Sequence, residues 1–184
     1  MIRVRVVSAG VLWVMTAAAP FAGGPDAASG PGVTDSMAHS RVRSTHAYLR
    51  AMIGEAVLRS RTFRDLVAAI EATDGIVYVE HGACMKSVHA CLILDVTAAG
   101  RYRILRIMVD ARQPDWDVMA SIGHELRHAL EVLEDRSVVN NPSMFFFYAQ
   151  TRDNRDRPFE TRAATDAGDA VRRELGSFAK GKPN

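Results

Sequence analysis

The apolar residues of this chain follow a helical pattern in four segments. In each segment they recur at intervals of three and four positions, the spacing of one face of an α-helix. Ser60 or Thr62 can cap the second helix, because short hydroxyl side chains favour the position before a helix. The predicted helices span about 45–59, from 60 or 62 to the turn at 72–75, from about 115 to the break at 140–143, and about 159–178. The stretch MFFFYAQ at 144–150 is a short apolar piece between the last two.

Three segments between the second and third helices are rich in Val, Ile, Leu and Tyr. They are 76–80, 91–96 and 102–109, and this composition predicts β-strands. The stretch TAAG at 97–100 is short enough to close a hairpin between the last two. We therefore expect a small antiparallel or mixed sheet of about three strands. Strands grouped together and followed by helices indicate an α+β fold.

The N-terminus has the layout of a secretory signal peptide. Arg3 and Arg5 precede an apolar run over residues 6–21, and small residues follow. Cleavage near Ala19 or Ala22 would remove residues 1–22. The alternative is a retained membrane anchor, but the run is shorter than the roughly 20 residues that a span needs. We expect a flexible leader at 23–43, a single domain at 44–184, and a mature chain in the periplasm or outside the cell without a stable membrane span.

Charge and cysteine content fit an exported protein that does not bind nucleic acid. The sequence has 23 Lys and Arg residues against 21 Asp and Glu residues, and loss of Arg3 and Arg5 with the signal balances the two signs. A basic nucleic-acid surface is therefore not indicated. Cys84 and Cys91 favour one disulfide in an oxidising compartment. A free thiol pair, or a metal site with the nearby His81 and His89, are the alternatives.

The sequence HELRH at 124–128 lies inside the third predicted helix. Positions i and i+4 of a helix are about 40° apart around its axis, so His124 and His128 can point their imidazoles at one metal ion. In the H-E-x-x-H arrangement two histidines bind zinc, and the glutamate, here Glu125, is the general base. The bland alternative is a helix that carries two histidines four positions apart by chance.

A catalytic zinc usually has three protein ligands, so a third must come from elsewhere. The metzincin continuation H-x-x-G-x-x-H is excluded, because Glu131 and Glu134 occupy those places. Glu160 is the better candidate, since it falls on the apolar stripe of the last predicted helix, where a carboxylate needs a partner. A first-turn glutamate stabilised by the helix dipole is the alternative. Glu131 is interpreted as support of the site, or simply as a solvated or helix-supporting carboxylate. Glu174, Asp166 and Asp169 are weaker ligand candidates.

With HELRH at 124–128 and ETRAA at 160–164, residues 60–178 resemble the gluzincins, zinc metallopeptidases whose third ligand is a glutamate on a later helix. The resemblance implies a zincin-like fold with His124, His128 and Glu160 as ligands of one Zn²⁺ and Glu125 as base. It also implies that an edge strand of the sheet holds an extended peptide. The family usually adds a Tyr or His that stabilises the oxyanion. Tyr148 is the nearest candidate here, and a core aromatic is its alternative role.

The leading hypothesis is an exported zinc-dependent hydrolase, a metallopeptidase that acts on a peptide or protein substrate. The second is a non-catalytic exported zinc-binding domain that binds a peptide or a cell-envelope partner. The third is a structural domain without metal. The sequence carries no feature that predicts an oligomeric state.

Overall fold

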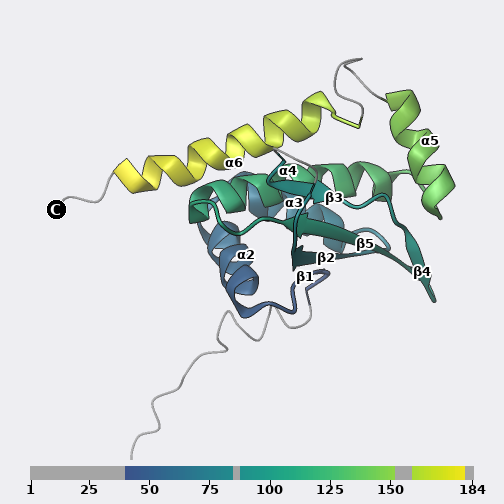
Figure 1. Ribbon diagram of the computed structural model, residues 1–184, viewed down its shortest axis with the longest axis horizontal. Coiled ribbons are helices and arrows are strands. Elements are labelled where there is room, and N and C mark those ends of the chain that lie inside the picture. Colours follow the sequence, from purple (N-terminus) through teal and green to yellow (C-terminus); the bar gives the residue numbers. More distant parts are fainter. Residues whose placement is uncertain (1–39, 85–87, 152–158, 181–184) are drawn as a thin grey trace, which may run out of the picture. The chain divides into compact units, whose positions relative to one another are not determined.

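The computed structural model describes residues 40–84, 88–151 and 159–180. Within these residues the fold is α+β, with five helices and a mixed sheet of five strands, as the sequence predicts in outline (Figure 1). The predicted signal peptide and nearly all of the leader lie outside the described residues. The elements are β1 (Val42–Arg43), α2 (Ala47–Arg59), α3 (Arg61–Glu71), β2 (Gly75–His81), β3 (Ala90–Leu92), β4 (Thr97–Ala99), β5 (Tyr102–Val109), α4 (Asp115–Glu134), α5 (Asn141–Thr151) and α6 (Arg162–Lys180).

The sheet is mixed, with β5 at its centre. Its strand order is β1-β2-β5-β3, and β4 also pairs with β5. The expected antiparallel pairing with β5 exists, since β3 and β4 both run antiparallel to it. Residues 97–99, predicted as part of the turn, form strand β4 instead, and the turn lies at Gly100, whose φ of 60° suits glycine. Of the two sheet types that the sequence analysis allows, the structure has the mixed one, since β2 pairs with β5 in parallel. The all-antiparallel alternative is wrong. The excursion through β3 and β4 supplies the crossover that two parallel strands require.

One face of the central strands is buried. Val77 and Val79 of β2 and Leu105 and Ile107 of β5 have no exposed surface, whereas the residues between them are partly or fully exposed. This alternation is that of strands with one face on the core. Val42 of β1 is also buried and pairs with Val77, so the fold includes two residues that the sequence analysis gives to the leader.

Helix α4 is the most deeply placed element. It packs against α6, α3 and the strands β3 and β5 (Figure 1). Twelve of its 20 residues are buried, on more than one face. A helix buried on several sides is typical of a domain's interior. A β-carbon at Gly123 would lie 2.8 Å from Cγ2 of Val171, so the glycine allows α6 to approach closely.

The C-terminal end of α4 is capped by a side chain from the sheet. Arg103 of β5 is only 5% exposed and donates to the carbonyl oxygens of Leu133 (2.6 Å), Asp135 (2.8 Å) and Val138 (2.9 Å). It also donates from Nη2 to Oδ1 of Asp74 at 2.7 Å. The last carbonyls of a helix lack intrahelical partners and carry partial negative charge, so a buried guanidinium satisfies and stabilises them.

The region after α4 differs from the prediction in two places. Residues expected as a break and a short apolar piece form helix α5, with Pro142 in its first turn, where proline is tolerated because the N–H would have no partner. Helix α6 begins at Arg162 rather than near 159. The hydroxyl of Thr161 accepts a hydrogen bond from the N–H of Ala164 at 3.2 Å and so caps the helix. Glu160 therefore precedes the helix and does not lie on its apolar stripe.

Cys84 and Cys91 form the predicted disulfide, with an S–S distance of 2.10 Å. It closes the loop between β2 and β3. Among the described residues, neither His81 nor His89 belongs to a group that could hold a metal ion. No helix in the described ranges is both long and apolar enough to cross a membrane.

Candidate metal centre

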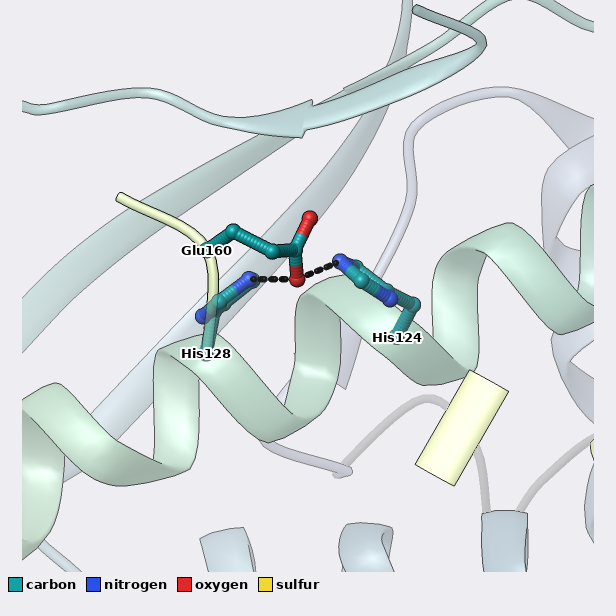
Figure 2. A group of neighbouring side chains, drawn as sticks. All are labelled: His124, His128 and Glu160. Atoms are coloured by element: carbon teal, nitrogen blue, oxygen red, sulfur yellow. Dashed lines mark ion pairs between the residues drawn. The ribbon is translucent and has the colours of Figure 1, made fainter. Parts of the chain in front are cut away.

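His124 and His128 lie on one face of α4, and Glu160 lies over both of them. Oε1 of Glu160 is 3.2 Å from Nε2 of His124 and 3.6 Å from Nε2 of His128 (Figure 2). The two imidazole rings have centroids 4.9 Å apart. One ligand atom from each of the three residues lies within 4.8 Å of the other two. The structure thus brings together the three metal ligands that the sequence predicts.

Glu160 is held by the segment before α6. Phe159, the residue before it, has a φ of 72°, which is left-handed and rare for an aromatic residue. The Phe159 ring packs against Phe145 and Tyr148, with centroids 5.9 and 6.0 Å away. These ring contacts with α5 help to hold a backbone conformation that costs about 1–2 kcal/mol. Strained backbone of this kind clusters at functional sites.

His124 is positioned by the close approach of α6. A β-carbon at Gly168 would lie 3.0 Å from Cβ and 3.4 Å from Nδ1 of His124. A larger residue at 168 would therefore displace His124 or α6 slightly from the present place. The side chain of His124 stays partly exposed, with Nε2 turned to Glu160.

His128 is 5% exposed and has a partner on each side. Its Nδ1 lies 3.3 Å from Oε2 of Glu131, and its Nε2 faces Glu160. Burial lowers the pKa of this imidazole, but hydrogen bonds to Glu131 and Glu160 outweigh it and raise the pKa to about 9. One ring nitrogen is therefore fixed by a carboxylate and the other is directed at the candidate metal position.

Glu125 is 7% exposed and lies beside the group. The backbone N–H of Leu92 in β3 donates to its Oε2 at 2.8 Å, and its Oε1 lies 3.9 Å from Nε2 of His124. Burial raises the pKa of this carboxyl, and the nearby His124 and His128 only partly oppose the shift. A buried carboxylate that has a raised pKa and lies beside a group of candidate metal ligands is suited to general-base chemistry.

The chemistry of the donor set fits a metal ion. Burial raises the pKa of Glu160, but hydrogen bonds from His124 and His128 dominate and bring it well below the usual range. Two imidazole nitrogens and one carboxylate oxygen are the ligands of catalytic zinc in several hydrolases. The three residues can therefore hold a metal ion, and in the structure the carboxylate itself occupies the space between the rings.

The remaining candidate site residues are not part of the ligand group. Glu174 accepts hydrogen bonds from the hydroxyls of Ser60 and Thr62 at 2.5 and 2.7 Å, which ties α6 to the start of α3. Asp166 and Asp169 are exposed. The buried hydroxyl of Tyr148 donates to the carbonyl oxygen of His128 at 3.0 Å, which is the core role left open above.

Sequence reasoning missed two contributors to the site. The N–H of Leu92 is a backbone group, and no side-chain pattern marks it. Thr161 had a detectable signal, since a threonine just before an apolar helical stripe is a typical cap.

The chain was compared with protein-family models, curated proteins and solved structures, and none of them matches it.

Proposed function

We propose that this chain is a zinc-dependent hydrolase that cleaves peptide bonds, built on a zincin-like fold of the gluzincin type. The observation that carries the proposal is the meeting of His124, His128 and Glu160, with Glu125 alongside. Two of these ligands come from one helix and the third from a segment 32 positions further on. Sequence proximity alone does not bring them together.

Each residue has a role that its surroundings support. Bound zinc supplies Lewis-acid polarisation of a carbonyl and brings water close to ionisation at neutral pH. His124, His128 and Glu160 hold the ion. Glu125 accepts the proton of the attacking water at Oε1, the oxygen not engaged by Leu92, and passes it to the leaving amine. Its raised pKa matches this exchange.

The sheet supports a peptide as substrate. Strand β3 is at the edge of the described sheet and contacts α4, and its Leu92 touches Glu125. An extended peptide laid along β3 would form backbone hydrogen bonds with it and bring a carbonyl towards the base. The disulfide supports an oxidising compartment, and we infer a periplasmic or extracellular location.

A second function is favoured by one observation. The hydroxyl of Tyr148 donates to the carbonyl oxygen of His128, so this tyrosine does not offer a donor to an oxyanion. A non-catalytic zinc-binding domain that holds a peptide or a cell-envelope partner would not need such a donor. This alternative keeps the metal and differs in having no turnover.

The test is zinc content of the chain from residue 23, measured by elemental analysis in wild type, His128→Ala and Glu160→Ala. His89→Ala, an exposed histidine outside the group, is the control. We expect one zinc per chain in wild type and control, and loss or weakening in the other two. Hydrolysis of a pool of quenched fluorescent peptides then separates the two functions. Absence of zinc from wild type after zinc addition would refute both.

A further inference from the structure

The carboxylate of Glu131 joins two parts of the site that are far apart in sequence. Its side chain, one turn beyond His128 on α4, is 11% exposed. Oε2 lies 3.3 Å from Nδ1 of His128, and Oε1 accepts a hydrogen bond from the hydroxyl of Thr161 at 2.8 Å. Nε of Arg127 lies 3.5 Å from the same Oε1. Both oxygens of this nearly buried carboxylate are therefore engaged.

In the neutral imidazole that binds a metal, contact with Glu131 decides which ring nitrogen of His128 keeps its proton. An ionised carboxylate only accepts hydrogen bonds, so Nδ1 of His128 donates to Glu131. Nε2 is then left to point towards Glu160. The hydrogen bond made by one imidazole nitrogen decides which nitrogen can bind a metal.

Contact with Thr161 fixes the segment that carries the third ligand. Thr161 follows Glu160 directly and caps the start of α6 through the N–H of Ala164. Its hydroxyl therefore accepts from α6 and donates to α4 at once. Glu160 sits between this anchored residue and the strained Phe159.

We propose that Glu131 is a positioning residue. It holds His128 and the segment that carries Glu160 in the relative positions that one metal ion requires. This role rests on the proposed metal centre. A carboxylate that orients a ligating histidine typically contributes 10–100-fold to metal affinity. Glu131 does this for one ligand directly and for a second through Thr161.

The chain offers a matched control on the same helix. Glu134 also faces Arg127, with 3.8 Å between Oε2 and Nη1, but its side chain is 57% exposed. Glu131→Gln and Glu134→Gln change the charge equally beside the same arginine. His128 and Thr161 contact different oxygens of Glu131, and a glutamine replaces one of these oxygens by an NH2 group, so it cannot accept from both residues in the present geometry. Thr161→Val removes the donor to Glu131, whereas Thr161→Ser keeps it.

The experiment is competition titration of metal-free protein with Zn²⁺, together with the absorption spectrum of the Co²⁺ form and the melting temperature without metal. We expect Glu131→Gln to bind Zn²⁺ 10–100-fold more weakly and to alter the Co²⁺ spectrum. Glu134→Gln and Thr161→Ser should match wild type, and Thr161→Val should fall between.

Three results would overturn the role. Wild-type affinity and spectrum in Glu131→Gln would refute it, and a lower melting temperature with unchanged affinity would make Glu131 merely structural. If Glu131→Gln fails to fold, wild-type affinity in Thr161→Val would refute the link to Glu160. Failure of wild type to bind either metal would instead refute the metal centre itself.

Discussion

Glu125 accepts a hydrogen bond from the backbone N–H of Leu92, with 2.8 Å between Oε2 and nitrogen. This contact joins the proposed general base on α4 to an edge strand of the sheet. It occupies one carboxylate oxygen and leaves the other turned towards His124. The orientation of the base therefore depends on β3, whose Cys91 is joined by the disulfide to Cys84.

Replacement of Glu125 by glutamine should strongly reduce turnover and preserve the metal. The amide oxygen of glutamine can still accept from Leu92, but an amide cannot take up a proton at neutral pH. We expect peptide hydrolysis to fall by about 10²–10⁴-fold, the usual contribution of a general base. Zinc content should stay at one per chain, because Glu125 is not in the ligand group. Unchanged hydrolysis in Glu125→Gln, with Glu134→Gln as control, would exclude Glu125 as the base.

Two glycines of α6 should respond to alanine in opposite ways. At Gly176 an added β-carbon meets nothing within 4 Å, so Gly176→Ala should stabilise the fold by about 1 kcal/mol through helix propensity. At Gly168 the added atom lies 3.0 Å from Cβ of His124, so the histidine or the helix must move. Denaturant unfolding and Zn²⁺ titration of both variants check this. Weaker zinc binding is expected in Gly168→Ala alone, and wild-type affinity there would show that His124 tolerates the shift.

Loss of Arg103 should be among the most damaging single substitutions. Arg103→Ala leaves the last carbonyls of α4 without their donor and removes the partner of Asp74. Each buried carbonyl oxygen left without a donor costs about 1–3 kcal/mol, whereas the Asp74 side chain, which is 46% exposed, adds little. Arg106→Ala, on the same strand, should cost less than about 1 kcal/mol, because Arg106 is exposed and 3.9 Å from Asp95. Urea unfolding of both variants gives the comparison, and equal costs would contradict the capping role.

The pair Asp74–Arg103 should make stability depend on pH in acid. The hydrogen bond from Arg103 lowers the pKa of Asp74 in the folded state, against the opposing effect of burial. The unfolded chain then takes up the proton first, so the contribution is complete above the unfolded pKa of about 3.9 and is lost as pH falls through the folded pKa.

The corresponding measurement is the free energy of unfolding of wild type and Asp74→Asn at pH 6 and pH 3. The difference between the two proteins should be larger at pH 6. In an Arg103→Ala background it should no longer change with pH, which tests the coupling directly. A difference that grows towards pH 3 would reverse the predicted sign.

The sequence predicts the helices and the site more completely than the sheet. Helical spacing marks α2, α3, α4 and α6, and the spacing of His124 and His128 is meaningful only on a helix. Alternation marks the faces of β2 and β5 but carries no information on which strands pair, so their parallel arrangement needed the structure. The buried position of Arg103 could have been predicted, because Arg103 alternates with Leu105 and Ile107 and so lies on the same buried face of β5. Only the structure reveals the carbonyls that it serves.

Glu160 was predicted as a ligand from an incorrect premise, although the structure does place it in a group that could hold a metal ion. The expected reason was a position on the apolar stripe of a helix. In the structure the residue precedes the helix, which begins at Arg162 and is capped by Thr161. Helix boundaries are set by caps and local strain, which periodicity locates only within a few residues.

The placement of Glu160 ahead of α6 has a consequence for the order of assembly. Thirty-one residues separate it from His128, so two donors are present once α4 has formed, and the third arrives only when the C-terminal part of the chain has docked. Two imidazoles alone would hold a metal weakly, and full affinity would appear together with the closure of this long loop. Metal uptake would then report completion of the chain's folding, and a protein truncated before Glu160 would bind the ion only weakly.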